Sequence, residues 1–332
     1  MLASSLQSFI LCRYLPSIVM CKPSSVKAVQ EEEDAAQDPK EEQKEKVSPF
    51  VANNIRFSDF VNPSKPWILI PNGSFGGHFD WVPAKLRTGP WHIASCLYLA
   101  FLCYWIYLNC LDAFVTRPPA PQAFEIHATN TWQHWYNVAA FGWTFYIAYR
   151  VATSEFGWGA FTSYTLQSWC LIIARHGLAA LAPYYAPATT LCEYLRFPML
   201  LQASITFIIW NFVLFPVVLA ACRTPKARKG FVRFCFGFLM TNLHILNLVF
   251  AAVGGIWGTP ARALTKVDFA VGLLFTLQYI LFYLFILDRL GLHYYMVFSP
   301  RSSLTLVTWT LLLGCLYGGY SLWSNILPRY VQ

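Results

Sequence analysis

Long apolar segments dominate the chain from residue 91 onward and alternate with short polar connections. A helix needs about 20 residues to cross the roughly 30 Å of hydrocarbon in a bilayer. The stretches of about that length are His92–Val115, Tyr136–Thr153, Gly159–Ala180, Phe197–Cys222, Val232–Gly254, Phe269–Leu287 and Thr305–Ile326. The pattern therefore predicts an all-α fold, a polytopic transmembrane helical bundle of six or seven spans over residues 92–327. The second stretch is the weakest, since it is short and ends in Arg150.

Two prolines lie in the fourth predicted span. Pro198 falls in the first turn, where the missing N–H leaves no helical hydrogen bond unmade. Pro216 lies deeper, and we expect it to kink the helix.

The first ninety residues have a different composition. Residues 1–30 contain no acid, several serines and Arg13, which is typical either of a targeting segment or of a flexible tail. Residues 31–46 carry eight of the sixteen acids of the chain. We expect residues 1–49 to be a disordered tail, with the charged run as its linker. Residues 50–91, rich in Pro, Gly and aromatic side chains, are predicted to form an irregular segment on the membrane surface.

Composition confirms the membrane class. Hydrophobic residues make up 56% of the 332 residues and charged residues 12%, against about 25% in a soluble domain. Outside residues 31–46 the chain has a surplus of bases over acids. In a membrane protein such a surplus usually faces the anionic cytoplasmic leaflet. Nucleic-acid binding would need a soluble basic face, and none is visible.

The connection from Arg223 to Arg233 carries five bases and no acid. Placing it in the cytosol also places the N-terminus, Arg150 and the Arg289–Arg301 connection there. Counted from residue 56, twelve bases then lie on the cytosolic side and six on the other, including Arg175, Arg196 and Arg262. The distribution favours an N-in, C-out bundle.

The ten cysteines contain no Cys-x-x-Cys pair. Cys96, Cys103 and Cys110 recur every seven residues and share one stripe of the first predicted span. We interpret them as small packing residues.

Polar side chains inside the spans are more informative, because burying them in hydrocarbon is costly unless they pair or function. Thr241, His244 and Asn247 lie three residues apart in the fifth span, so they form one stripe that should face the bundle interior. In the fourth span, Gln202, Ser204 and Asn211 are predicted to join helices by hydrogen bonds. His244 is the histidine nearest the middle of a span, and an imidazole there can take or give a proton.

Several chemistries are excluded by the residues at hand. Seven histidines without a His-x-x-His-His pattern cannot supply a di-iron site, and neither a phosphate-binding glycine loop nor a Gly-x-Ser-x-Gly elbow occurs. The remaining possibility is a catalytic pair of one hydroxyl and one histidine. In such a pair the imidazole accepts the hydroxyl proton while the oxygen attacks an ester carbonyl. No metal or other cofactor is required.

A series of short motifs resembles a known family. Phe161-Thr-Ser-Tyr-Thr-Leu166 opens one span, Asn242-Leu-His-Ile-Leu-Asn247 lies in a later one, and Tyr279-Ile-Leu-Phe-Tyr283 in the next. The order resembles the androgen-inducible transmembrane family and its relatives, the rolling stone membrane proteins, over about residues 135–327. Where rolling stone relatives tend to have an acid ten residues after the histidine, this chain has Gly254.

The resemblance implies an integral-membrane hydrolase of fatty acid esters of hydroxy fatty acids, with a threonine nucleophile and a histidine base. Matched segment by segment, these residues are Thr162 and His244, with Thr165 one turn deeper as the second candidate hydroxyl. Asn247, Tyr283 and Thr241 are expected to support them. The partners expected are the bilayer and a membrane lipid or fatty ester, and the location an endoplasmic reticulum or plasma membrane.

Two alternatives stay open at this stage. One is a non-catalytic membrane organising or fusion-associated protein of the rolling stone kind. The other is a transporter or receptor, for which Asp288-Arg289 is the only hint, and a juxtamembrane ion pair explains that dipeptide better.

Overall fold

The computed structural model describes residues 91–116, 129, 131–154, 157–222, 224–288, 295, 298–302 and 304–331. The predicted tail over 1–49 and the surface segment over 50–91, except residue 91, lie outside the described residues, so neither prediction is tested.

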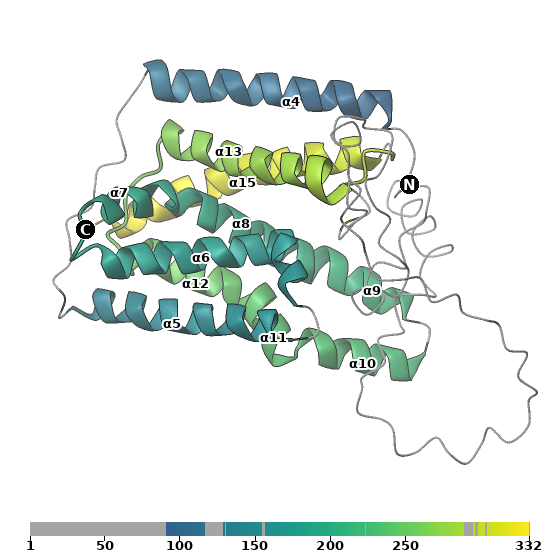
Figure 1. Cartoon of the computed structure of the whole chain (residues 1–332), viewed down its shortest axis with the longest axis horizontal. Helices are drawn as coiled ribbons and strands as arrows, with labels where there is room; N and C mark the ends of the chain where they lie inside the picture. Colours follow the sequence, from purple (N-terminus) through teal and green to yellow (C-terminus); the bar gives the residue numbers. More distant parts are fainter. Residues whose placement is uncertain are drawn as a thin grey trace, which may run out of the picture.

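Every regular element in the described part of the chain is a helix, as the sequence predicts (Figure 1). The α-helices are α4 (Ile93–Leu111), α5 (Trp132–Ala152), α6 (Tyr164–Leu181), α7 (Pro187–Tyr194), α8 (Arg196–Ile208), α9 (Phe215–Ala221), α10 (Pro225–Cys235), α11 (Phe238–Thr241), α12 (Asn247–Ile256), α13 (Lys266–Phe282) and α15 (Leu304–Ile326). Short 3-10 turns are η4 (Trp158–Thr162) and η9 (Leu327–Tyr330), and π-helices are η3 (Asp112–Thr116), η5 (Ile209–Leu214), η6 (Asn242–Leu246) and η7 (Tyr283–Leu287).

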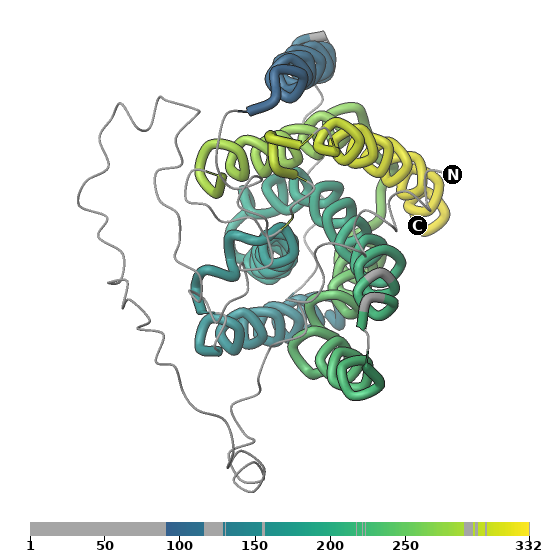
Figure 2. The backbone as a smooth tube through the Cα atoms, turned by 90° about the vertical axis from the view of Figure 1, so that its right-hand side faces the viewer, coloured from purple at the N-terminus to yellow at the C-terminus, as the bar shows by residue number. Residues whose placement is uncertain are grey.

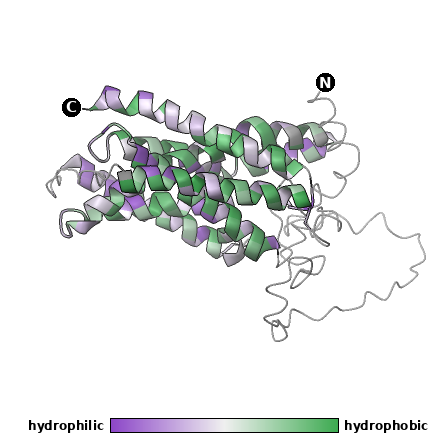
Figure 3. Ribbon diagram, turned by 90° about the horizontal axis from the view of Figure 1, so that it is seen from above, coloured by the Kyte–Doolittle hydropathy of each residue, from purple (hydrophilic) through white to green (hydrophobic). Residues whose placement is uncertain are grey.

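Among the described residues, five helical segments are long and apolar enough to cross a membrane, and the chain is a membrane-embedded helical protein. They are Ile93–Val115, Pro187–Ala220, Phe238–Ile256, Lys266–Leu287 and Leu304–Tyr330. Apolar residues, green in Figure 3, cover most of the visible helical surface. The other two predicted spans, Tyr136–Thr153 and Gly159–Ala180, correspond to α5 and α6, which have 21 and 18 residues. These two helices are less apolar, because Gln, His, Asn, Tyr and Arg side chains interrupt them.

Helix α8 occupies the centre of the bundle, and all its residues from Arg196 to Thr206 are buried. It packs against α6, α12, α13 and α15. Two buried clusters meet along it. One joins α8 to α4, α13 and α15 around Phe197 and Tyr283, and the other joins it to α5, α6 and α12 around Trp169 and Leu200.

Helix α4 lies at the edge of the bundle, against α13 and α15 (Figures 1 and 2). Only 17% of its span is buried within the protein, and Cys110 contacts the Ala270 carbonyl of α13. Of the three cysteines predicted to pack, Cys103 and Cys110 are half-buried, whereas Cys96 is exposed.

Several span boundaries differ from the prediction, most clearly that of the fifth span, and the fourth span begins at Pro187 rather than Phe197. The fifth span begins at Phe238 rather than Val232, because residues 225–235 form the separate helix α10 and the chain turns at Gly237. In the fourth span, the irregularity expected at Pro216 is the π-helix η5 immediately before it, and Pro216 stands in the first turn of α9. A π-turn there removes the clash that the proline ring would otherwise make with an α-helical carbonyl.

We predict that Gly272 is required for close contact between α13 and α8. A Cβ at this position would lie 2.6 Å from Cε1 of Phe197, whose ring is fully buried. Overpacking of this kind costs about 1–3 kcal/mol. Gly272→Ala should therefore lower the melting temperature in detergent, whereas Gly314→Ala on α15, with nothing within 4 Å, should leave it unchanged or raise it. Equal melting temperatures of the two variants would contradict this packing.

Candidate functional site

His244 lies in the π-helix η6 and is 6% exposed. Its Nδ1 is 3.1 Å from the Met240 carbonyl oxygen, so Nδ1 carries the proton of the neutral ring and donates it to that oxygen. Among the described residues, Nε2 has no hydrogen-bonding partner. A ring held through one nitrogen, with the lone pair of the other nitrogen available, has the form required of a general base.

An aromatic ring covers one face of this imidazole. Trp210, in η5, stacks on His244 with 3.8 Å between ring centroids and 22° between planes. Next to it, Asn211 donates from Nδ2 to the carbonyl oxygens of Phe207 and His244. The two π-helices η5 and η6 therefore lie side by side, and the predicted role of Asn211 in joining helices is confirmed. Trp323 likewise donates to Ser204, whereas the Oε1 of Gln202 has no partner among the described residues.

Asn247 connects η6 to α6. The side chain is fully buried, its Nδ2 donates to the Leu243 carbonyl, and its Oδ1 accepts from Ser168 at 3.4 Å. Ser168 has a buried hydroxyl and was not predicted as a site residue. It lies three residues after Thr165, which lies three residues after Thr162. That spacing of three is the signal that points to it.

Two hydrogen bonds fix the register of α6 against α12. Ser168 contacts Asn247, and Arg175 Nη1 donates to the Gly254 carbonyl at 2.8 Å; both pairs are 79 residues apart. An equal offset at two points means that the helices run parallel. This register holds for α6 and α12 themselves, because His244 belongs to the π-helix η6 and Thr162 to the turn η4.

The two candidate threonines have different surroundings. Thr162 ends the turn η4, before α6 begins, and its Oγ1 donates to the Gly159 carbonyl at 2.7 Å. Thr165 stands in the first turn of α6, half-buried, and its hydroxyl makes no hydrogen bond to any described residue. Ser163 caps the helix between them by accepting from Leu166 N.

The other two residues expected to support the site are Thr241 and Tyr283. Thr241 is half-buried at the end of α11. Tyr283 is fully buried in the cluster around α13, and its hydroxyl donates to the Tyr295 carbonyl at 2.8 Å. This hydrogen bond from the phenol to the backbone was not predicted from the sequence.

A buried ionic cluster occupies the other end of the bundle, where α6, α7, α8 and α13 meet. Glu193 accepts from Arg196 at 2.6 Å and from Arg262 at 2.6 Å, and lies 3.8 Å from Arg175. Arg262 also pairs with Asp268, which caps α13. Although burial lowers the pKa of Arg262, the carboxylates of Asp268 and Glu193 raise it above its ordinary value.

This cluster removes three bases from the count of charges on the two sides of the membrane. Arg175 and Arg196 are fully buried, and Arg262 pairs with both acids, so these three bases do not contribute free positive charge to a loop surface. The pairing of these arginines could be anticipated from the sequence, because an arginine beside a long apolar segment usually pairs inside the protein.

Next to the cluster, His176 lies fully buried with Nδ1 2.8 Å from Asn137 Oδ1. Asn137 in turn donates to the Gly258 carbonyl at 2.6 Å. A Cβ at position 254 would lie 2.6 Å from His176 Cε1, so the ring fills the space that a side chain there would need. This contact explains why glycine stands at position 254 in this chain.

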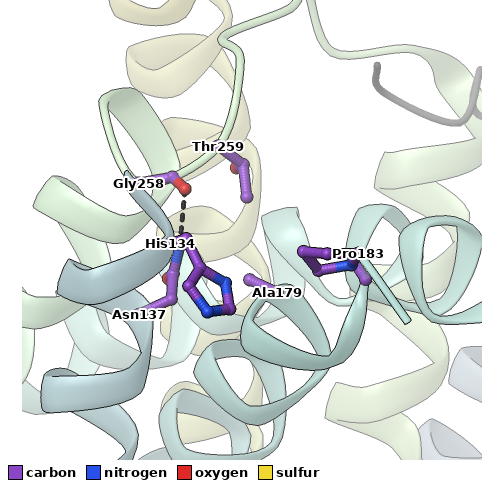
Figure 4. A pocket seen from close by; sticks show the side chains of 7 residues that line it. His134, Asn137, Ala179, Pro183, Gly258 and Thr259 are labelled. Carbon is purple, nitrogen blue, oxygen red and sulfur yellow. Dashed lines mark hydrogen bonds between the residues drawn. The ribbon is translucent and has the colours of Figure 1, made fainter. Parts of the chain in front are cut away.

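A small cavity lies beside these residues, lined by His134, Asn137, Ala179, Pro183, Gly258 and Thr259 (Figure 4). Its volume is about 10 Å³, which suits one water molecule. The buried Nδ1 of His134 has no partner among the described residues and is available to such a water. The cavity is far too small for a fatty ester. Among the described residues, no three His, Cys, Asp or Glu side chains are grouped as metal ligands would be.

Comparison of the chain with known protein families, with curated proteins and with solved structures finds no match. The functional interpretation therefore rests on the residues and their geometry.

We predict that the ionic cluster stabilises the bundle. Glu193→Gln leaves the buried Arg175 and Arg196 without a full negative charge, which should lower the free energy of unfolding by about 3–5 kcal/mol. Asp112→Asn is the matched control, since it breaks the exposed pair with Lys266 and should cost at most about 1 kcal/mol. Unfolding in mixed detergent micelles measures both values. A loss in Glu193→Gln no greater than in the control would refute the role of the cluster.

Proposed function

We propose that this chain is an integral-membrane hydrolase of lipid esters in which His244 is the general base, with α5 and α6 as two further spans of the bundle. The observation that carries the proposal is the geometry of the imidazole. It is buried in a membrane-embedded bundle, its Nδ1 is fixed by Met240 O, and its Nε2 is unpartnered among the described residues. A ring fixed through Nδ1, with the lone pair of Nε2 available, meets the requirement for a general base.

The nucleophile comes from the threonines at the start of α6. The family resemblance implies Thr162, whose hydroxyl donates to the Gly159 carbonyl. Thr165 stands one turn deeper, on α6 itself, and its hydroxyl makes no hydrogen bond to a described residue. We therefore favour Thr165 as the attacking group, with Thr162 as the alternative.

The proposed reaction has two steps, acylation of the threonine and hydrolysis of the acyl-threonine. His244 Nε2 takes the threonine proton while the oxygen attacks the ester carbonyl, and the protonated imidazole then gives that proton to the departing alkoxide of the hydroxy fatty acid. Water next attacks the acyl-threonine, His244 takes a proton from the water and returns it to the threonine, and the fatty acid leaves. Substrates of this class, fatty acid esters of hydroxy fatty acids, are apolar enough to reach the site through the bilayer.

We predict distinct effects for three substitutions, assayed with a hydroxy-fatty-acid ester and the protein in liposomes. His244→Ala and Thr165→Ala should each lower kcat/KM at least about a thousandfold, as loss of a base or nucleophile does. Thr162→Ala should have a smaller effect if it only positions the turn through Gly159.

Thr308→Ala is the control, because this half-buried threonine on α15 only donates to the Leu304 carbonyl. A thousandfold loss in Thr162→Ala with an active Thr165→Ala would reassign the nucleophile. Full activity in His244→Ala would refute the mechanism, and a wild-type protein without esterase activity would favour the non-catalytic membrane organiser.

We also predict that Trp210 stabilises the protonated imidazole. An aromatic face over a cation contributes about 0.5–2 kcal/mol. Trp210→Leu should thus lower kcat between about twofold and thirtyfold with little change in KM, while Trp210→Phe keeps most of the rate. Phe207→Leu, one turn away in a ring contact with Phe212, is the matched control. A change confined to KM would contradict this role.

A further inference from the structure

Helix α10 presents a concentration of positive charge. Lys226, Arg228, Lys229 and Arg233 are all exposed on this eleven-residue helix, which contains no acid. We call these four side chains the basic face of α10. None of them forms an ion pair with a described acid, whereas Arg262, Lys266 and Arg301 are each neutralised by an aspartate.

The other side of α10 fastens it to α9. Phe231 stacks on Phe215 with 5.7 Å between ring centroids, and Arg228 Nε donates to the Cys222 carbonyl. Cys235 is buried, and burial raises the pKa of its thiol to about 12, so it remains a neutral packing group. The helix is therefore held in one orientation. Lys226, Lys229 and Arg233 lie on the side away from these contacts, and Arg228 is exposed next to them.

The position of α10 in the chain places it where the backbone leaves the membrane. It connects the apolar segments Pro187–Ala220 and Phe238–Ile256 and lies with α9 at the end of the bundle opposite α7 (Figure 1). Phe234 and Phe236 are 45% and 60% exposed beside the basic side chains. Basic residues next to exposed aromatic rings on a short amphipathic helix are typical of segments that lie among lipid headgroups.

We propose that the basic face of α10 binds the headgroups of anionic phospholipids in the adjacent leaflet. The phosphates and carboxylates of these lipids complement the four cations, which pair with no acid in the described part of the chain, and the exposed phenylalanines reach the acyl chains below. Each lysine or arginine near an anionic surface strengthens lipid binding by about fivefold. This binding is independent of any catalytic activity at His244.

The test uses the full chain in bilayers of phosphatidylcholine that contain a trace of spin-labelled lipid. We expect spin-labelled phosphatidylserine to be immobilised by the protein several-fold more than spin-labelled phosphatidylcholine in 50 mM salt. The preference should fall steeply in 500 mM salt, because salt screens exposed charges. Equal immobilisation of the two lipids by the wild-type protein would overturn the proposal, whatever the behaviour of any variant.

Two variants locate the binding surface. Lys226→Gln/Arg228→Gln/Lys229→Gln should lose the preference for phosphatidylserine. The control Arg150→Gln/Lys266→Gln/Arg329→Gln removes the same charge elsewhere and should keep it. Both must melt at the wild-type temperature in detergent for the comparison to count; if the α10 variant does not, the salt dependence of the wild type decides. An unchanged preference in the α10 variant, or an equal loss in the control, would refute a site on α10.

Discussion

The need to satisfy every polar group away from water organises this bundle. In hydrocarbon no solvent replaces a missing hydrogen bond, so indole, amide and guanidinium groups inside the bundle are favoured where they find a protein partner. Trp169 donates to the Thr144 carbonyl, and Trp323 to Ser204. The Glu193 cluster follows the same rule with charges, since three arginines converge on one carboxylate. These bonds tie helices together where apolar packing alone would allow them to slide.

The same requirement shapes the region around His244. A π-turn leaves carbonyl groups free of their usual helical partners, and the side chains of η5 and η6 use them. His244 bonds the Met240 carbonyl, and Asn211 bonds the carbonyl of His244. The widened turns also bring the Trp210 ring flat against the imidazole. Local irregularity of the helices thus accompanies a buried histidine that is held through Nδ1 and stacked face to face on an indole.

Much of the fold was predictable because hydrophobic length is a strong signal. The helical class and most span positions followed from apolar runs, and the polar stripe containing His244 and Asn247 correctly indicated a buried face. The break at Gly237 was not predictable, because the apolar residues of α10 continue the pattern of the following span without interruption. Periodicity along one helix also carries no information on register between helices. The pairs Ser168–Asn247 and Arg175–Gly254 reveal that α6 and α12 run parallel with an offset of 79 residues.

The contact between His176 and Gly254 links two positions that are 78 residues apart in the chain. Because the imidazole fills the volume above the glycine Cα, a carboxylate can stand at position 254 only after residue 176 has become small. The two positions thus constrain each other sterically. Any side chain at position 254 requires a smaller residue at position 176, so the size of one residue on α6 sets what α12 can carry at this point.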